Sequence, residues 1–379
     1  MKVLLTGGGT GGHITPLLAV AHELKQSSAP AEIMYVGERR GKFVHLIQNK
    51  PDIDSFKLIF AGKFRRYHNE SWIKKLVDVK TNLLNLRDII YLCIGTVQSV
   101  ALLIKNRPDV IFIKGGFVGV PVGVAARILR IPFITHDSDT TPGLANRIVG
   151  RWARYHATAM PASFYPYKQS LVRHVGIPLS DNFRSVDEKT KAQYRKELTI
   201  PHNAKVVLVT GGSQGAQRMN HLVSPVLLDL LRQRSNLYIV HQTGRRGNVS
   251  YQEFKERCIV MEFIDDLHKY SAAADVIVCR GSATSLAEFA VQGKPCVVIP
   301  APHLASGHQV KNTQHLEKLG AVLALDEVEL AKQSDLLKTT LTSLLDDDTA
   351  RKRLVDNFRK TTKSNAAKNI AKLLLEFNT

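Results

Sequence analysis

Short apolar runs alternate with helical segments through the first half of the chain. The apolar run at residues 3–6 leads into the glycine-rich segment 7–16, after which apolar residues recur at helical spacing. Further apolar runs follow at residues 33–37, 56–59, 110–113 and 132–136. Strands that alternate with helices in this way predict an α/β fold with a parallel, doubly wound sheet.

A second series of the same kind follows the segment 175–178. The polar run 181–199 predicts a linker and a short helix, and the strand at 205–210 leads into a second glycine-rich segment, 211–216. Further strands are predicted at 237–240, 258–261, 275–279 and 295–300. We therefore predict two Rossmann-like domains facing across a cleft, at residues 1–175 and 176–350. Residues 351–379 are predicted to be helical, with a return to the first domain as one option.

Glycine-rich loops follow two strands of the first domain. Glycines at 7–12 let the backbone N–H groups approach a ligand, and the start of the following helix favours an anion. A second glycine loop, with Gly115 and Gly116, follows the strand at 110–113. Ligands of open α/β sheets bind at this edge, so we expect the two loops to share one crevice. For either loop alone, a tight turn without a ligand is the alternative.

A turn rich in small polar residues follows the strand at 275–279. Its backbone N–H groups, with hydroxyls such as those of Thr284 and Ser285, suit a diphosphate. Glu288 can accept hydrogen bonds from a ribose diol, and the amide of Gln309 can bind sugar hydroxyls. These residues predict a sugar-nucleotide site in the second domain.

Composition and charge narrow the class of protein. With 44% apolar and 22% charged residues, the chain has the composition of a soluble globular protein. Its net charge of +19 favours polyanionic partners: nucleic acid, an anionic membrane or phosphorylated substrates. The four cysteines lack paired spacing, which argues against a zinc site and for thiols in a reducing compartment. No signal peptide pattern is present at the N-terminus.

Basic and aromatic residues intermingle at positions 62–80. This composition suits a surface that contacts anionic lipid, while the alternative is an ordinary core stripe with solvated cations. The longest uncharged stretch, 89–104, is shorter than the roughly 20 apolar residues of a spanning helix, so we expect any membrane contact to be peripheral.

Taken together, the motifs resemble the MurG family of N-acetylglucosaminyltransferases over nearly the whole chain. The resemblance implies a GT-B fold and inverting transfer of N-acetylglucosamine from UDP-N-acetylglucosamine to the C4 hydroxyl of the muramoyl sugar of lipid I. It implies no metal or other cofactor, no specific nucleic acid partner, and a peripheral position at the cytoplasmic face of the inner membrane. It rests on residues 7–16, 115–121, 211–216, 262–266, 280–288 and 308–312.

The resemblance also assigns residues. His13 is expected to be the catalytic base or to orient the acceptor, with a structural or phosphate-binding role as the alternative. The donor contacts are Ser213, Ile264, Ala283, Thr284, Ser285, Leu286, Glu288 and Gln309. The acceptor side is lined by Thr10, Gly11, Gly12, His13, Gly115, Gly116, His136 and Asp139. The membrane face comprises Phe64, Arg65, Arg66, Trp72, Ile73, Lys74 and Lys75.

Several positions depart from the family pattern. His-Asp-Ser-Asp stands at 136–139 in place of His-Glu-Gln-Asn, and Ser180 in place of an Arg. Gly281 and Ser282 invert the usual order, and Gly307 replaces a frequent Asp. The departures leave contacts at Asp139 and Ser180 open, and His136 could instead be a satisfied histidine at a strand end.

Other enzyme classes share parts of this pattern. A glycolipid glycosyltransferase or a UDP-sugar 2-epimerase would also have the GT-B fold. Gly7, Gly9 and Gly12, with Glu38 after the next strand, also fit the fingerprint of an NAD-dependent oxidoreductase. A dehydrogenase has no need of the second glycine loop and the Glu288 cluster, which counts against that class.

Overall fold

The computed structural model describes residues 1–379 except 10, 40, 42–43, 49, 65–77, 213–214, 246, 248, 304–306 and 378–379. The chain divides into two compact units: Met1–Ser180 with Lys363–Thr379, and Asp181–Thr362. The division thus falls after Ser180, where the sequence prediction placed it after residue 175. The C-terminal segment that belongs to the first unit begins at Lys363, whereas the predicted C-terminal helical segment began at residue 351.

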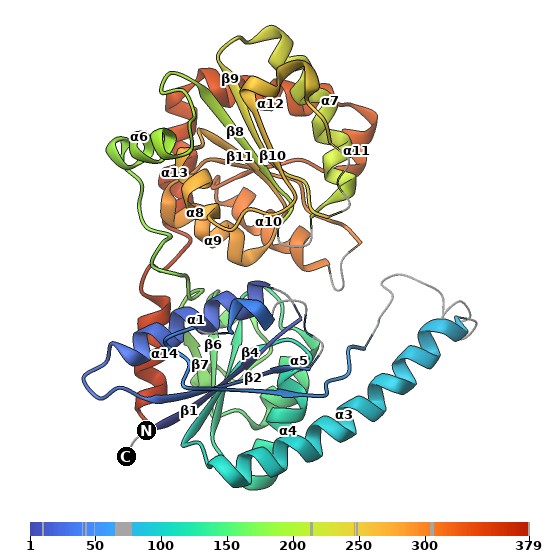
Figure 1. Ribbon diagram of the computed structural model, residues 1–379, viewed down its shortest axis with the longest axis vertical. Coiled ribbons are helices and arrows are strands. Elements are labelled where there is room, and N and C mark those ends of the chain that lie inside the picture. Colours follow the sequence, from blue (N-terminus) through green and yellow to red (C-terminus); the bar gives the residue numbers. More distant parts are fainter. Residues whose placement is uncertain are drawn as a thin grey trace. The chain divides into compact units, whose positions relative to one another are not determined.

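The first unit is built on one parallel sheet, whose described strands run in the order β3-β2-β1-β4-β5-β6-β7 (Figure 1). The strands are β1 Lys2–Gly7, β2 Glu32–Glu38, β3 Ser55–Ile59, β4 Val110–Gly115, β5 Phe133–Asp137, β6 Tyr155–Thr158 and β7 Val172–His174. The first five confirm the predicted strands. The prediction missed β6 and β7, because the sequence of β6 is half polar and β7 has three residues.

Helices cover both faces of this sheet, which explains why its central strands are almost continuously apolar. They are α1 Gly11–Lys25, α3 Val79–Asn106, α4 Gly119–Leu129, α5 Leu144–Val149 and α14 Ala366–Leu375, with 3₁₀ turns at Val44–Leu46, Gly150–Trp152, Ala162–Phe164 and Gln169–Leu171. The C-terminal helix α14 packs against α1 (Figure 1). Its residues Ile370 and Leu374 share a buried cluster with Leu17 of α1. α1 begins at Gly11, so Thr15 and Pro16 lie inside it.

The order of strands reverses between β1 and β4, which is where ligands bind in such sheets. The two glycine loops follow these two strands and pack against each other. A Cβ atom on Gly116, which has φ +80°, would lie 2.3 Å from the Gly8 carbonyl oxygen. Only glycine fits this position, because a side chain would collide with backbone and the φ value is unfavourable for other residues.

The second unit repeats the plan with strands in the order β10-β9-β8-β11-β12-β13. They are β8 Lys205–Thr210, β9 Leu237–Gln242, β10 Cys258–Met261, β11 Val276–Cys279, β12 Cys296–Val298 and β13 Leu323–Ala324. The helices are α6 Glu188–Glu197, α7 Gln217–Gln233, α8 Leu267–Ala273, α9 Ala283–Gln292, α10 His308–Lys318, α11 Glu327–Lys332, α12 Asp335–Asp346 and α13 Asp348–Arg359, with a 3₁₀ turn at Gln252–Arg257. Two parallel-sheet α/β units are confirmed. Only the two-residue β13 was not predicted.

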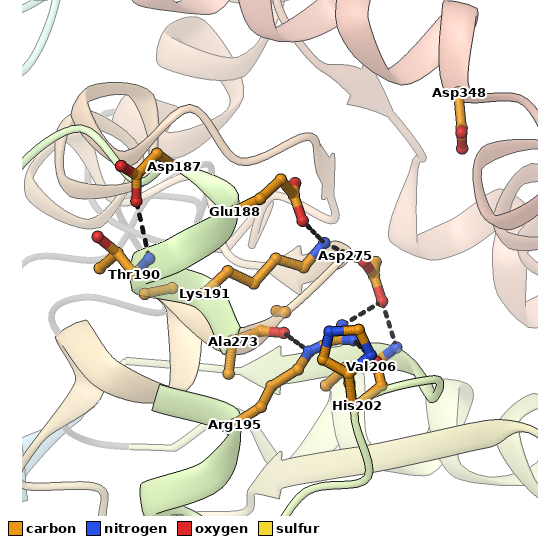
Figure 2. A network of polar contacts seen from close by, with 12 residues as sticks. Asp187, Glu188, Thr190, Lys191, Arg195, His202, Val206, Ala273, Asp275 and Asp348 are labelled. Atoms are coloured by element: carbon orange, nitrogen blue, oxygen red, sulfur yellow. Dashed lines mark hydrogen bonds and ion pairs between the residues drawn. The ribbon is translucent and has the colours of Figure 1, made fainter. Parts of the chain in front are cut away.

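A buried polar network attaches the predicted short helix α6 to the amino end of this second sheet (Figure 2). Asp275 precedes β11 and accepts hydrogen bonds from Arg195 Nη2 and Val206 N, at 2.8 and 2.7 Å. Lys191 Nζ lies 2.8 Å from the other carboxylate oxygen. The network lies at the opposite end of the strands from the ligand-binding edge, so its role is structural.

The helix α3 extends beyond the sheet of the first unit and packs against α4 (Figure 1). Its segment Thr81–Asn106 is long and apolar enough to cross a membrane by length and composition, and no other described helix of 18 or more residues meets that test. Core helices of soluble proteins can meet it as well. Exposed apolar side chains recur along α3: Val79, Leu83, Leu86, Ile90, Val97 and Ile104.

Candidate functional site

In the first unit, side chains from two helices meet beside Gly115. A Cβ atom on Gly115, which has φ +106°, would lie 3.6 Å from the amide of Asn146 and 3.7 Å from His13 Cδ2. His13 lies in the first turn of α1 and is partly exposed. We call His13, Gly115 and Asn146 the Gly115 site. It lies at the strand-order reversal, where the sequence predicted the acceptor loops.

His136, at the end of β5, is buried and hydrogen-bonded through one ring nitrogen. Its Nε2 lies 2.8 Å from the Gly176 carbonyl oxygen, which can only accept, so Nε2 carries the proton. Burial, with the positive charge of Lys114, lowers the pKa of His136 well below its usual value. The ring is therefore neutral and Nδ1 is an acceptor, and this atom has no hydrogen-bond partner among the described residues.

Asn146 is fixed in a similar way. Its Nδ2 donates to the His136 carbonyl oxygen at 2.8 Å and to Asp137 Oδ1 at 2.9 Å. The amide atom that faces these two acceptors must be the donor, Nδ2, so the other atom of the amide is Oδ1. Within the described part of the chain this buried oxygen also lacks a partner.

Two of the residues that depart from the family pattern, Asp137 and Ser138, take part in polar contacts at the end of β5. Tyr167 donates to Asp137 Oδ2 at 2.8 Å, and burial raises the pKa of Asp137. Lys114 Nζ donates to Ser138 Oγ at 2.7 Å. Burial lowers the pKa of Lys114 to about 8, although the charges of Asp139 and Asp137 oppose this shift. Asp139 itself keeps a partly exposed side chain next to this network.

Sequence reasoning assigned no role to Lys114 and Asn146. A partial signal existed, because both residues lie near the carboxyl end of the first sheet: Lys114 is the penultimate residue of β4, and α5, which contains Asn146, follows β5. Lys114 precedes the glycine pair, and Asn146 lies in the first turn of α5. Their significance depends on partners that are distant in sequence, such as Ser138 for Lys114.

In the second unit the strand order reverses between β8 and β11, and α9 begins after β11. The N-cap residue of α9, Ser282, makes no side-chain capping bond to the first N–H groups of the helix, and N–H groups in this position suit an anionic ligand. A Cβ on Gly281 would lie 2.6 Å from the Gln309 carbonyl oxygen and from Thr313 Oγ1. Close packing against α10 therefore explains why glycine precedes Ser282 here.

The predicted donor residues that the structure describes lie in α9 or near it. Glu288 keeps some exposed surface, yet burial raises the pKa of its carboxyl to about 8. Ile264 and Leu286 are buried. Gln309 Oε1 accepts from Ala301 N at 3.0 Å, which fixes the side chain at the start of α10. Ala283 and Thr284 are buried in the first turn of α9, while Ser285 is partly exposed.

Arg280 stabilises the turn before α9. It is buried, its Nη1 donates to the Ile299 carbonyl oxygen at 2.9 Å, and it pairs with the buried Glu327 at the start of α11. The guanidinium thus connects β11, the end of β12 and α11. Glu327 was not foreseen, because an acid 47 positions after Arg280 gives no local signal.

Several predicted residues lie outside the described residues. These are Thr10, Ser213, Arg65, Arg66, Trp72, Ile73, Lys74 and Lys75. Phe64 is described and is partly buried. In the described part of the chain no group of three or more His, Cys, Asp or Glu residues could hold a metal ion.

Two domain models of known protein families match the chain, one in each half. Residues 3–158 match the glycosyltransferase family 28 N-terminal domain, and residues 206–374 match the family 28 C-terminal domain. A UDP-N-acetylglucosamine–N-acetylmuramyl-(pentapeptide) pyrophosphoryl-undecaprenol N-acetylglucosamine transferase of Caldicellulosiruptor saccharolyticus is 30% identical over 100% of this chain and 98% of its own length. The chain belongs to the MurG family.

Other relatives of this MurG-family chain carry the same enzyme name. The protein of Syntrophotalea carbinolica is 32% identical, covering 92% of this chain and 89% of its own, and that of Clostridium perfringens is 31% identical, covering 98% and 97%. The resemblance inferred from the motifs is therefore confirmed.

Solved structures share the fold. Acinetobacter baumannii MurG superposes with a TM-score of 0.71 at 22% identity over 99% of both chains. A UDP-GlcNAc 2-epimerase from Neisseria meningitidis, bound to UDP-GlcNAc, gives 0.67 at 15% identity over 99% of this chain and 100% of its own. The predicted GT-B fold is confirmed, and this fold is common to transferases and epimerases.

Proposed function

We propose that this chain transfers N-acetylglucosamine from UDP-N-acetylglucosamine to lipid I, the undecaprenyl-diphospho-muramoyl peptide, and so makes lipid II for peptidoglycan synthesis. The observation that carries the proposal is full-length identity of 30–32% to enzymes named for this reaction. The two sites at the strand-order reversals support it, because one suits a nucleotide diphosphate and the other brings an imidazole to a pair of glycine loops.

The second unit binds the donor in this proposal. The N–H groups at the start of α9 hold the diphosphate and stabilise the charge that grows on UDP as it leaves. Glu288 binds the ribose, Ile264 the uracil through its backbone, and Gln309 the hexose. Because the helix supplies this stabilisation, no metal is required, and the rate of UDP release should be the same with and without a chelator.

The first unit binds the acceptor. Attack on the anomeric carbon requires the C4 hydroxyl to lose its proton, and imidazole is the commonest general base in enzymes. His13 takes this role in our proposal because its ring lies at the Gly115 site, beside the two glycine loops. Acceptor-dependent UDP release by purified protein tests the assignment, and release that is equally fast without acceptor would contradict it.

Substitution of Glu288 tests the donor site. Because burial favours the neutral carboxyl, E288Q keeps a similar group, whereas E288A removes the hydrogen bonds to the ribose. We expect E288A to raise the KM for UDP-N-acetylglucosamine about tenfold, the equivalent of about one hydrogen bond, and E288Q to raise it less. Steady-state kinetics at saturating acceptor measures both. An equal loss in the two variants would mean that the ionised carboxylate binds the donor.

We also propose that the exposed apolar side of α3 contacts the membrane in which lipid I resides. Val79, Leu83, Leu86 and Ile90 recur at spacings of three and four residues, as expected for one face of a helix. The basic aromatic segment expected to contact the membrane immediately precedes α3 in sequence. A helix that inserts apolar side chains into the lipid interface and has basic residues beside them binds peripherally to anionic membranes.

The double variant L83Q/L86Q tests this contact. Each leucine is more than half exposed, so the fold should tolerate the change. Loss of two inserted leucines should weaken binding to vesicles that contain anionic lipid by about 100-fold or more, at about 1.5–3 kcal/mol per side chain. Turnover of a soluble short-chain acceptor should not change. The control L319Q, an exposed leucine of the second unit, should bind vesicles normally; equal losses in both variants would exclude α3 as the contact.

A further inference from the structure

Glu327 holds a buried negative charge at the ligand-binding edge of the second sheet. It is the first residue of α11 and follows β13, the strand next to β12. Its Oε2 lies 2.5 Å from Nη1 of Arg280, and both side chains are more than nine-tenths buried. Burial of a charge is costly, and a partner of opposite charge offsets that cost. The two side chains therefore hold each other in place.

The ion pair spans three neighbouring strands. Arg280 follows β11 directly, and its Nη1 also donates to the carbonyl oxygen of Ile299, which follows β12. Carboxyl ends of parallel strands meet at one edge of the sheet, so Glu327, after β13, can reach this arginine. Oε1 of the same carboxylate lies 3.9 Å from Nη1 of Arg218, in the first turn of α7. One carboxylate thus connects the ends of β11 and β13 and approaches the start of α7.

Arg280 also belongs, through its backbone, to the turn that begins α9. Its carbonyl oxygen accepts from Ser282 N at 2.9 Å, and the Ser282 carbonyl oxygen accepts from Leu286 N at 2.9 Å in the first turn of the helix. Gly281, between Arg280 and Ser282, packs closely against α10. A shift of Arg280 would therefore move the N–H groups that hold the diphosphate in the proposed function.

We propose that Glu327 is a positioning residue of the donor site, which acts through Arg280 to hold the start of α9 at the diphosphate. The inference rests on the proposed function, in which N–H groups of α9 bind the diphosphate of UDP. Glu327 itself does not contact the substrate. Loss of the ion pair should weaken binding of the diphosphate and leave binding of the nucleoside, assigned to Glu288 and Ile264, unchanged.

The variant E327Q tests this role with little change of shape. The amide keeps the size of the carboxylate but not its charge, so Arg280 loses its ionic partner. We expect the Kd for UDP to rise about 3- to 10-fold, the equivalent of about one hydrogen bond, and the Kd for uridine to stay the same. Isothermal titration measures UDP binding, and displacement of UDP measures uridine binding. The control E329Q makes the same change at an exposed position of α11 and should leave both constants unchanged.

A second variant, R280K, tests whether Glu327 acts through the arginine. Lysine keeps the positive charge but lacks the planar fork of donors with which Arg280 faces Ile299 and Glu327. R280K should weaken UDP binding by itself, and E327Q added to R280K should weaken it no further, because both changes break the same link.

Three results would overturn the proposal: an unchanged or lower Kd for UDP in E327Q, equal rises for UDP and uridine, or additive rises in the double variant. A lower Kd would mean that Glu327 only neutralises the arginine. Equal rises would mean a general disturbance of the second unit. Failure of the parent protein to bind UDP would refute the proposed function and the inference with it, whereas an unchanged Kd in E327Q would refute the inference alone.

Discussion

Replacement of His13 by Gln should lower kcat for glycosyl transfer by about 10²- to 10⁴-fold, the contribution typical of a positioned general base. The attacking hydroxyl must lose its proton as the new bond forms, and an amide cannot accept it. The KM for UDP-N-acetylglucosamine should change little, because the donor residues belong to the second unit. Single-turnover kinetics with saturating donor and acceptor measures the chemical step.

A matched control lies on the same helix. His22 of α1 pairs with Asp52 at 3.1 Å, away from the glycine loops, so H22Q makes the same chemical change outside the site. We expect H22Q to keep the parent rate. If H13Q also stays within tenfold of the parent rate, His13 is not the base and serves to bind phosphate or to support the loop.

Replacement of Asp275 by Ala should destabilise the second unit by about 3–5 kcal/mol, the usual cost of leaving one partner of a buried ion pair. The carboxylate holds the buried Arg195, Lys191 and the Val206 N–H group together (Figure 2). Without it, the Arg195 guanidinium stays buried and keeps only its bonds to the carbonyl oxygens of Ala273 and His202.

Denaturant unfolding followed by far-ultraviolet circular dichroism measures this change, since both tryptophans belong to the first unit. Burial by itself would raise the pKa of Asp275, but Lys191 and Arg195 lower it below its usual value. The stabilisation is therefore complete above the unfolded-state pKa of about 4 and is lost as the pH falls through the folded-state value. At pH 7 the full destabilisation by D275A should therefore be seen.

The control variant D229A removes an exposed partner of Lys338 and should change the free energy of unfolding little. If D275A had a similarly small effect, the structural role of Asp275 would be contradicted.

Much of the architecture could be predicted because it is encoded locally. Apolar runs that end in glycine loops identify β1, β4 and β8, and buried strands of a parallel sheet carry this pattern strongly. β6 and β7 escaped prediction because short or half-polar strands lack it. Thr15 lies inside α1, where its hydroxyl donates to the Gly11 carbonyl oxygen.

The site was predictable in its backbone and less so in its side chains. Gly115, Gly116 and the turn before Glu288 could be placed from sequence, because glycine and small polar residues have definite backbone uses. The bonds from Lys114 to Ser138 and from His136 to Gly176 join residues 24 and 40 positions apart. Such partners meet only through the strand order, so the network around the departing residues could not be derived from local pattern.

The identity of the products tests the central claim most directly. Purified protein is incubated with isotopically labelled UDP-N-acetylglucosamine, with and without a lipid I analogue, and the products are identified by mass spectrometry and NMR. The account predicts one UDP and one N-acetylglucosaminyl-muramoyl disaccharide with inverted anomeric configuration for each acceptor consumed, and no reaction of the donor alone. Conversion of the donor to its 2-epimer, or release of UDP without acceptor, would contradict it.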